Sequence, residues 1–197
     1  IERNLLQVFF FVMNKFPNNF KTVSKNINMH YTKIKSLMFN ERKTFELLME
    51  KITETVIKHL YTQIQAGVSL VQIFDTWAGC LSVSDYAEYA FPYQKAVIDK
   101  IKDLSDTPVT LYINGCGNLL EKMVQTGADV LSIDWMLDLA EAKRRVGDKV
   151  SLQGNLDPCC LYGPPEFIRA KTLETLNKFG KETGYIFNLG HGILPDI

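Results

Sequence analysis

Residues 45–77 read FELLMEKITETVIKHLYTQIQAGVSLVQIFDTW and contain the repeating unit of the fold. Apolar side chains recur at three- and four-residue steps from Phe45 to Ile64, which predicts a helix of about six turns. Gly67 supplies a stop signal for that helix. The mostly apolar run 68–75 that follows is typical of a strand buried on both faces. This stretch therefore predicts one helix followed by one buried strand.

The same alternation continues to the end of the chain. The periodicity predicts further strands over 109–114, 130–134, 150–155 and 185–189, and further helices over 84–104, 118–126, 137–146 and 164–179. The segment 84–104 is one helix or two helices broken near Pro92, and Pro164 and Pro165 open the last helix, where a missing N–H costs least. Strands that alternate with helices imply parallel pairing with right-handed crossovers, so the class is α/β.

Polar and aromatic residues collect directly after the carboxyl ends of the predicted strands. They are Asp75, Thr76, Trp77, Asn114, Asp134, Trp135, Asn155, Asp157 and His191. This edge is where (β/α)8 barrels place their chemistry, whereas the stretch 114–118 lacks the spacing of a dinucleotide-binding fingerprint. The pattern favours a barrel over a doubly wound sheet. Five strands cannot close a barrel of eight, so we predict an incomplete barrel with two unpaired edges. Such edges predict aggregation, assembly with another chain, or a sheet that does not close.

Composition and charge exclude several function classes. The 197 residues include 22 Lys and Arg against 22 Asp and Glu, and 46% are hydrophobic. A zero net charge argues against a nucleic-acid partner. The four Cys show no secreted-type framework, which predicts reduced thiols in the cytoplasm. The apolar run 5–13 is too short for a membrane span of roughly 20 residues.

The first forty residues differ from the remainder. They contain six basic residues against one acidic residue, together with seven of the twelve Asn. Helix-period spacing is poor over 14–30, so the pattern predicts a tail rather than a core element. We set the boundary between an atypical N-terminal segment, 1–30, and a partial barrel domain, 31–197.

From about Tyr31 onward the chain resembles the uroporphyrinogen decarboxylases of haem biosynthesis, which have a TIM-barrel fold. The resemblance is carried by FDTWAG at 74–79, GADVLSIDW at 127–135, LQGNLDP at 152–158 and FNLGHGILP at 187–195. It implies conversion of uroporphyrinogen III to coproporphyrinogen III by removal of the four acetate carboxyl groups as CO2. It also implies a cytoplasmic homodimer that uses no metal or organic cofactor.

The resemblance also implies three substrate-binding residues. Thr76 matches a hydroxyl residue that contacts substrate, Phe74 matches an aromatic residue of the same wall, and His191 matches a histidine that contacts a substrate carboxylate. An imidazole suits this role because it donates a hydrogen bond and can gain charge beside an anion.

Each of these residues has a structural alternative. Thr76 and Trp77 could cap the next helix and fill the barrel mouth. Gly190 and Gly192 around His191 allow close approach or positive φ in a plain turn as well as in a functional loop.

Other polar residues carry weaker signals. His59 is expected to be structural or to face solvent near its helix end, and His30 carries no signal. Asp134 and Asp157 could be acids or could cap helices, as Asp residues at strand ends often do.

The chain departs from the family pattern in its N-terminal part. The family's Arg-rich motif and its Asp at the centre of the macrocycle have no counterpart here, so we assign no catalytic residue. A Tyr-Met-x-Glu-Gly-Gly-like block is replaced by the stretch 21–28, which suggests a disrupted reading frame over residues 1 to about 30. Independent activity is doubtful, and a non-catalytic remnant or complementing fragment is the alternative.

A second alternative is a zinc-dependent methyltransferase of the same superfamily. Those proteins use a His-x-Cys-Gly element with a further distant Cys, whereas this chain has Asn114 where the His should be and His191 in the final loop. Cys159 and Cys160 are adjacent and lack chelate spacing. One Cys116 does not make a zinc site, so no metal is predicted.

Overall fold

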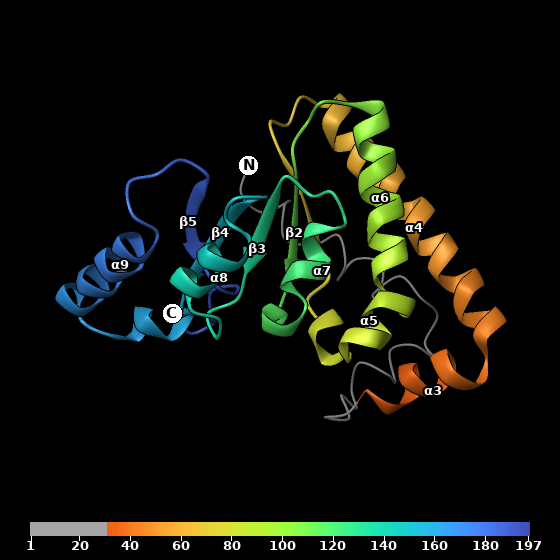
Figure 1. The fold of residues 1–197 in the computed structure, drawn as a ribbon, viewed down its shortest axis with the longest axis horizontal. Coiled ribbons are helices and arrows are strands. Elements are labelled where there is room, and N and C mark those ends of the chain that lie inside the picture. Colours follow the sequence, from red (N-terminus) through yellow and green to blue (C-terminus); the bar gives the residue numbers. More distant parts are fainter. Residues whose placement is uncertain (1–30) are drawn as a thin grey trace.

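The computed structural model describes residues 31–197, which form a single curved α/β unit around one parallel sheet (Figure 1). Within these residues the sheet has five strands in the order β1-β2-β3-β4-β5, every pair parallel. The strands are β1 (Val71–Phe74), β2 (Val109–Ile113), β3 (Val130–Ile133), β4 (Ser151–Leu156) and β5 (Tyr185–Leu189). Because every strand pairs with its successor in the sequence, the order is that of a barrel rather than of a doubly wound sheet.

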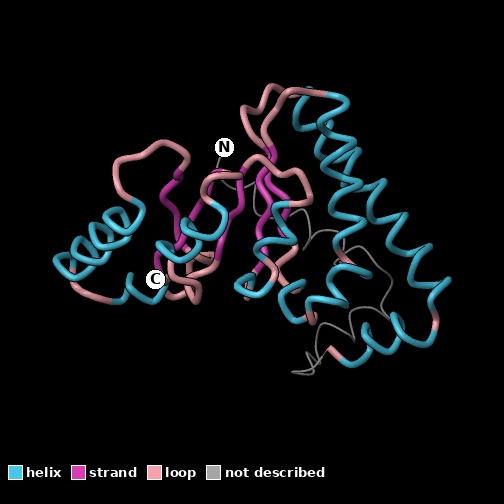
Figure 2. Tube along the Cα trace, in the orientation of Figure 1, coloured by secondary structure: helices cyan, strands magenta, loops and turns pink. Residues whose placement is uncertain are grey.

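Helices connect successive strands, as parallel pairing requires (Figure 2). The helices are α3 (Thr32–Asn40), α4 (Arg42–Gln65), α5 (Val83–Tyr89), α6 (Phe91–Leu104), α7 (Leu120–Val124), α8 (Leu139–Val146) and α9 (Pro165–Phe179). Three 3-10 turns lie after strand ends: η1 (Ala78–Cys80), η2 (Cys116–Asn118) and η3 (Pro158–Tyr162). Between residues 31 and 197 no helix combines the length and the apolar character needed to cross a bilayer.

Most predicted elements are confirmed. The segment 84–104 forms two helices that meet at Ala90, with Pro92 in the first turn of α6, where it blocks no helical hydrogen bond. The first strand begins at Val71 rather than at Val68.

No helix was predicted over residues 32–40, which share the basic character of the first forty residues but lie inside the predicted barrel domain. These form α3, which buries Met38 to 3% exposure. Lys35 Nζ donates to the Cys80 carbonyl (3.1 Å), and the ring of Tyr31 lies 5.6 Å from that of Trp77. The helix contains Lys33 and Lys35, and a helix with such residues can bury one apolar side chain while its charges stay in water. The predicted anomalies of residues 1–30, including His30, lie outside the described residues.

The core lies between the helices and the convex face of the sheet. Alternate strand residues Ile73, Leu111 and Ile133 are buried there. They belong to the same cluster as Ile98 of α6 and Met123 of α7, both fully buried. Every second side chain of a strand thus packs against the apolar stripe that repeats every 3.6 residues along a helix.

The sheet is strongly curled toward its other face. Gln153 of β4 donates a hydrogen bond to Gln72 of β1 over 3.2 Å, although these strands lie three positions apart. In a flat sheet three strand spacings would separate them by about 14 Å. Tyr112 of β2 likewise donates through its hydroxyl to the carbonyl of Gly190, just after β5, at 3.0 Å. This curvature confirms an incomplete (β/α)8 barrel.

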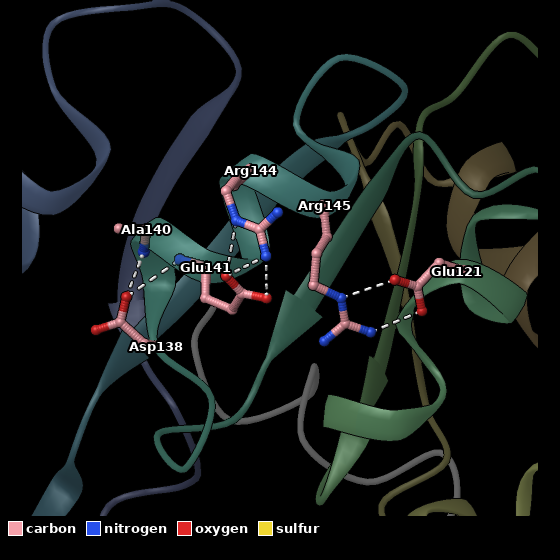
Figure 3. Close-up of polar contacts among 6 residues, drawn as sticks. All are labelled: Glu121, Asp138, Ala140, Glu141, Arg144 and Arg145. Atoms are coloured by element: carbon pink, nitrogen blue, oxygen red, sulfur yellow. Dashed lines mark hydrogen bonds and ion pairs between the residues drawn. The ribbon is translucent and has the colours of Figure 1, made fainter.

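Helix α8 is fixed by charged groups at its start and along its length (Figure 3). Asp138 caps it, accepting from the N–H groups of Ala140 (2.9 Å) and Glu141 (3.1 Å). Arg145 makes a two-point ion pair with Glu121 of α7, at 2.7 and 2.6 Å. The pair joins neighbouring helices over the sheet, and Arg145 is only 21% exposed.

Replacing Asp138 by Ala should lower the free energy of unfolding by about 1 kcal/mol, because two N–H groups of the first turn lose their acceptor. Denaturant unfolding measures this change. The matched variant Glu141→Ala keeps the cap and loses only an exposed pair with Arg144, so it should change stability by less than about 0.5 kcal/mol. Equal effects of the two variants would refute the capping role.

Candidate functional site at the carboxyl ends of the strands

Four rings form a continuous array at the carboxyl ends of the strands. Tyr112 lies at its centre, with Phe74 of β1 at 5.9 Å and His191 at 6.1 Å between ring centroids. Trp135, after β3, contacts the other side of His191 at 5.8 Å in an edge-to-face arrangement. The residues come from four strands or strand ends, and such pairs stabilise a fixed arrangement by about 1 kcal/mol each. The array makes a wall of apolar surface with one imidazole in it.

Thr76 lies in the loop after β1, beside this wall. Its hydroxyl has no hydrogen-bond partner among residues 31–197, and it caps no helix there. Its carbonyl accepts from the N–H of Asn114 at 3.3 Å. The capping alternative therefore fails for Thr76. Trp77 is 46% exposed, and its ring lies 5.6 Å from that of Tyr31.

His191 is exposed, and its backbone is held by a close approach. Gly190 is buried, and a Cβ there would lie 2.4 Å from the backbone N of Trp135. Gly192 has nothing within 4 Å of such a Cβ. Of the two reasons for glycine considered from sequence, close approach thus applies at Gly190, and it places His191 against Trp135.

Asp134 organises the middle of this edge and is fully buried. Its carboxylate accepts from the N–H groups of Cys116 (2.9 Å) and Met136 (2.8 Å), while Asn155 donates to its carbonyl at 2.9 Å. Burial, followed by the neighbouring Asp134, raises the pKa of the Cys116 thiol to about 12. Asp134 thus holds the loops together, and Cys116 stays a protonated thiol near neutral pH.

The remaining candidates have ordinary structural roles. Asp157 caps η3, accepting from the N–H of Cys159 at 2.9 Å. His59 lies exposed on α4 and bonds Gln63 one turn later, at 2.8 Å, as expected. Within the described part of the chain, no three His, Cys, Asp or Glu side chains come close enough together to hold a metal ion.

A hydrogen-bonded link joins buried Tyr86 and Gln94 to partly buried Asp75, the residue between Phe74 and Thr76. The hydroxyl of Tyr86 donates to Gln94 Oε1 at 2.6 Å, and Gln94 Nε2 donates to Asp75 Oδ2 at 2.7 Å. Tyr86 is fully buried and Gln94 is 5% exposed. Desolvation raises the pKa of Asp75, which the bond from Gln94 only partly opposes. The link joins α5 and α6 to the residue between Phe74 and Thr76.

The raised pKa of Asp75 predicts the pH dependence of stability. The folded-state pKa of Asp75 lies above the unfolded value of 3.8. The stability that protonated Asp75 contributes is therefore present below pH 3.8 and is lost as pH rises through the folded-state pKa. The Asn side chain of Asp75→Asn does not ionise, so this variant avoids the loss of stability. Its amide oxygen can still accept the hydrogen bond from Gln94. We expect this variant to gain stability relative to the parent chain as pH rises from 4 to 8, measured by denaturant unfolding.

Asp138→Asn is the control for this experiment, because hydrogen bonding to Lys178 lowers the pKa of Asp138. Its stabilising contribution is present above the unfolded pKa and is lost as pH falls through the folded pKa. The two variants should therefore differ from the parent chain with opposite pH slopes. A pH-independent difference for Asp75→Asn would contradict the assignment.

Tyr112 and Gln94 were not identified as site residues from the sequence. Tyr112 lies within a strand whose residues are all buried, so nothing local marks it. The parallel register pairs it with Phe74, and a register argument could have found it. Gln94 occurs in an ordinary amphipathic helix, and no pattern shows that its amide points inward.

These features define an incomplete (β/α)8-barrel protein with a candidate ligand site at the carboxyl ends of its strands. The family model described as Uroporphyrinogen decarboxylase (URO-D) matches residues 21–197, beginning upstream of the boundary predicted at residue 31. The chain therefore belongs to the uroporphyrinogen decarboxylase family.

Individual relatives agree with this assignment. The uroporphyrinogen decarboxylase of Pectobacterium atrosepticum is 46% identical over 170 residues, covering 85% of this chain and 48% of the relative. That of Trichodesmium erythraeum is 44% identical over 167 residues, covering 84% and 47%. The chain thus spans about half the length of the curated relatives that it matches.

A solved structure shares the fold. A methyltransferase from Methanosarcina mazei superposes with a TM-score of 0.69 over 82% of this chain and 48% of its own, at 23% sequence identity. This likeness supports the barrel architecture alone.

Proposed function

We propose that this chain forms part of the substrate-binding edge of a uroporphyrinogen decarboxylase, which removes the acetate carboxyl groups of uroporphyrinogen III as CO2 and yields coproporphyrinogen III. The observation that carries the proposal is the ring array of Phe74, Tyr112, His191 and Trp135. A wall of rings suits the flat faces of a tetrapyrrole, and relatives of this name match most of the chain.

Three side chains would bind the substrate. Phe74 packs against a pyrrole face, Thr76 offers a hydroxyl with no described partner, and His191 donates a hydrogen bond to a carboxylate. Each group binds and orients, which is a large part of catalysis when the bond to be cleaved must be held in one geometry. The family's Asp and Arg motifs have no counterpart in this sequence, so proton transfer and neutralisation of the other carboxylates need groups beyond these residues.

Binding can be tested apart from turnover. Both Trp residues, Trp77 and Trp135, lie at this edge, so uroporphyrin, the stable oxidised form, should quench their emission on binding. His191→Ala should weaken the affinity about tenfold or more through loss of a hydrogen bond to a charged group. His59→Ala, on exposed α4, is the matched control and should leave the affinity unchanged. Equal affinity of the parent chain and His191→Ala would refute the role of His191.

The complementing-fragment alternative is favoured by the open sheet. Within residues 31–197 no strand pairs with the outer edge of β1 or of β5, and unpaired edges are templates for further strands. Turnover of uroporphyrinogen under anaerobic conditions, followed by chromatography of the products, distinguishes the candidates. Activity that appears only after adding the N-terminal half of the Pectobacterium relative would identify a complementing fragment. Inactivity in both cases would indicate a non-catalytic remnant.

We further propose a homodimer in the cytoplasm as the assembly and compartment of the complete enzyme. Sedimentation of the chain with and without the added half tests the assembly directly. A monomer in both conditions would contradict the dimer.

A further inference from the structure

The link Tyr86–Gln94–Asp75 runs from two buried side chains to a partly buried carboxylate. It contains a carboxylate whose pKa is raised by burial, and no ion pair joins Asp75 to a cation within residues 31–197. A desolvated carboxylate without a cation is expensive, and an apolar side chain would pack at lower cost. Groups retained at such a cost are often found at functional sites rather than in purely structural positions.

The backbone around Asp75 shows what the link holds. The N–H of Asp75 donates to the carbonyl of Tyr112 at 3.0 Å, and its carbonyl accepts from the N–H of Ala78 at 3.2 Å. The next residue, Thr76, accepts from the N–H of Asn114 at 3.3 Å. Asp75 is therefore fixed through its main chain to β2 and η1, and through its side chain to α6.

We propose that Asp75 and Gln94 are positioning residues for the tetrapyrrole site: their hydrogen bond, backed by Tyr86, fixes the end of β1 at Phe74 and the turn that carries Thr76. This inference rests on the proposed function for the identity of the ligand, but the placement of the turn can be measured without any ligand. The bond itself, rather than the negative charge, does the positioning. Neither residue needs to touch the substrate.

Two substitutions separate the bond from the charge. Gln94→Leu preserves most of the side-chain volume and removes the bond, whereas Asp75→Asn removes the charge and keeps an acceptor for Gln94 Nε2. We expect Gln94→Leu to weaken uroporphyrin affinity about tenfold, and Asp75→Asn to bind within about twofold of the parent chain. If Gln94→Leu folds poorly, Tyr86→Phe replaces it in the experiment. This variant removes a single hydroxyl and should change the affinity in the same direction.

The control for general destabilisation is Thr126→Val. Thr126 is fully buried below the opposite ends of the strands, where its hydroxyl donates to the Met123 carbonyl at 2.6 Å. Thr126→Val loses a buried hydrogen bond, as Gln94→Leu does, but Thr126 lies at the turn between α7 and β3. Thr126→Val should lower the melting temperature and leave the affinity unchanged. If Gln94 had a purely structural role, Gln94→Leu would show the same combination.

Amide hydrogen exchange supplies the ligand-free measurement. In Gln94→Leu the N–H groups of Ala78 and Asn114 should exchange about tenfold faster, while in Asp75→Asn and Thr126→Val they should stay within about twofold of the parent chain. Equal losses in Asp75→Asn and Gln94→Leu would overturn the proposal in favour of a charge effect. Unchanged exchange in both Gln94→Leu and Tyr86→Phe would overturn it entirely. Failure of the parent chain to bind uroporphyrin would refute the proposed ligand, while exchange would still decide the positioning.

Discussion

Gly79→Ala should lower the free energy of unfolding by about 3 kcal/mol or more and disrupt the loop that carries Thr76. A Cβ at this position would lie 1.8 Å from the carbonyl oxygen of Asn114 and 2.9 Å from its carbonyl carbon. Both are backbone atoms, so no rotamer change can relieve the overlap. The loops after β1 and β2 must separate, which would also break the bond from the Asn114 N–H to the Thr76 carbonyl. Denaturant unfolding and tetrapyrrole affinity measure the two consequences.

Gly117→Ala is the matched control for this substitution. Gly117 lies in the neighbouring turn η2, and its nearest contact for a Cβ is Leu137 Cδ1 at 3.9 Å, an ordinary van der Waals distance. We expect a change in unfolding free energy within about 0.5 kcal/mol. A mild effect of Gly79→Ala, similar to that of Gly117→Ala, would show that the two loops are not held in contact.

Gly190→Ala should have the second largest effect, because the added methyl group meets backbone on the other side of the site. Its Cβ would lie 2.4 Å from the N and 2.9 Å from the Cα of Trp135. Moving the loop outward would also break the bond from the Tyr112 hydroxyl to the Gly190 carbonyl. We expect a loss of about 2 to 3 kcal/mol in stability and at least about a tenfold loss of uroporphyrin affinity, since His191 moves with the loop.

Gly192→Ala tests whether the position next to His191 is generally sensitive. A Cβ at Gly192 would meet nothing within 4 Å, so stability should change by less than about 0.5 kcal/mol. Gly190 and Gly192 flank the same histidine, so the difference between the effects of Gly190→Ala and Gly192→Ala isolates the close approach to Trp135. If Gly192→Ala weakens tetrapyrrole binding as much as Gly190→Ala does, the affinity depends on loop flexibility and not on the contact.

The order and class of the elements were predictable because they depend on local patterns. Apolar periodicity changes between 3.6 and 2 along each repeat, and Gly or Pro marks the boundaries, so short windows suffice. The strand Tyr185–Leu189 was predicted with its observed bounds. The helix over Thr32–Asn40 was missed because it was grouped with the basic, Asn-rich stretch of the first forty residues, while its buried Met38 depends on packing against α4.

The positions of Phe74, Thr76 and His191 next to strand ends were also determined by the sequence, as was the expectation that parallel strands bring such ends to one edge. The contacts that join these positions were not determined by the sequence. Tyr112 reaches Gly190 across 78 residues of sequence, and Gln94 reaches Asp75 from an otherwise ordinary helix. These contacts depend on the curl of the whole sheet and on which side of α6 faces inward.

The sequence by itself thus determined a parallel barrel segment with a polar and aromatic edge, since strand and helix formation follow from neighbouring residues. Tertiary structure alone decided the ring array around Tyr112, the close approach of Gly190 to Trp135, and the hydrogen bond between Gln94 and Asp75. The physical reason is that curvature sums small rotations over five strands. Contacts across the concave face therefore depend on all of the strands together and on no single stretch of the chain.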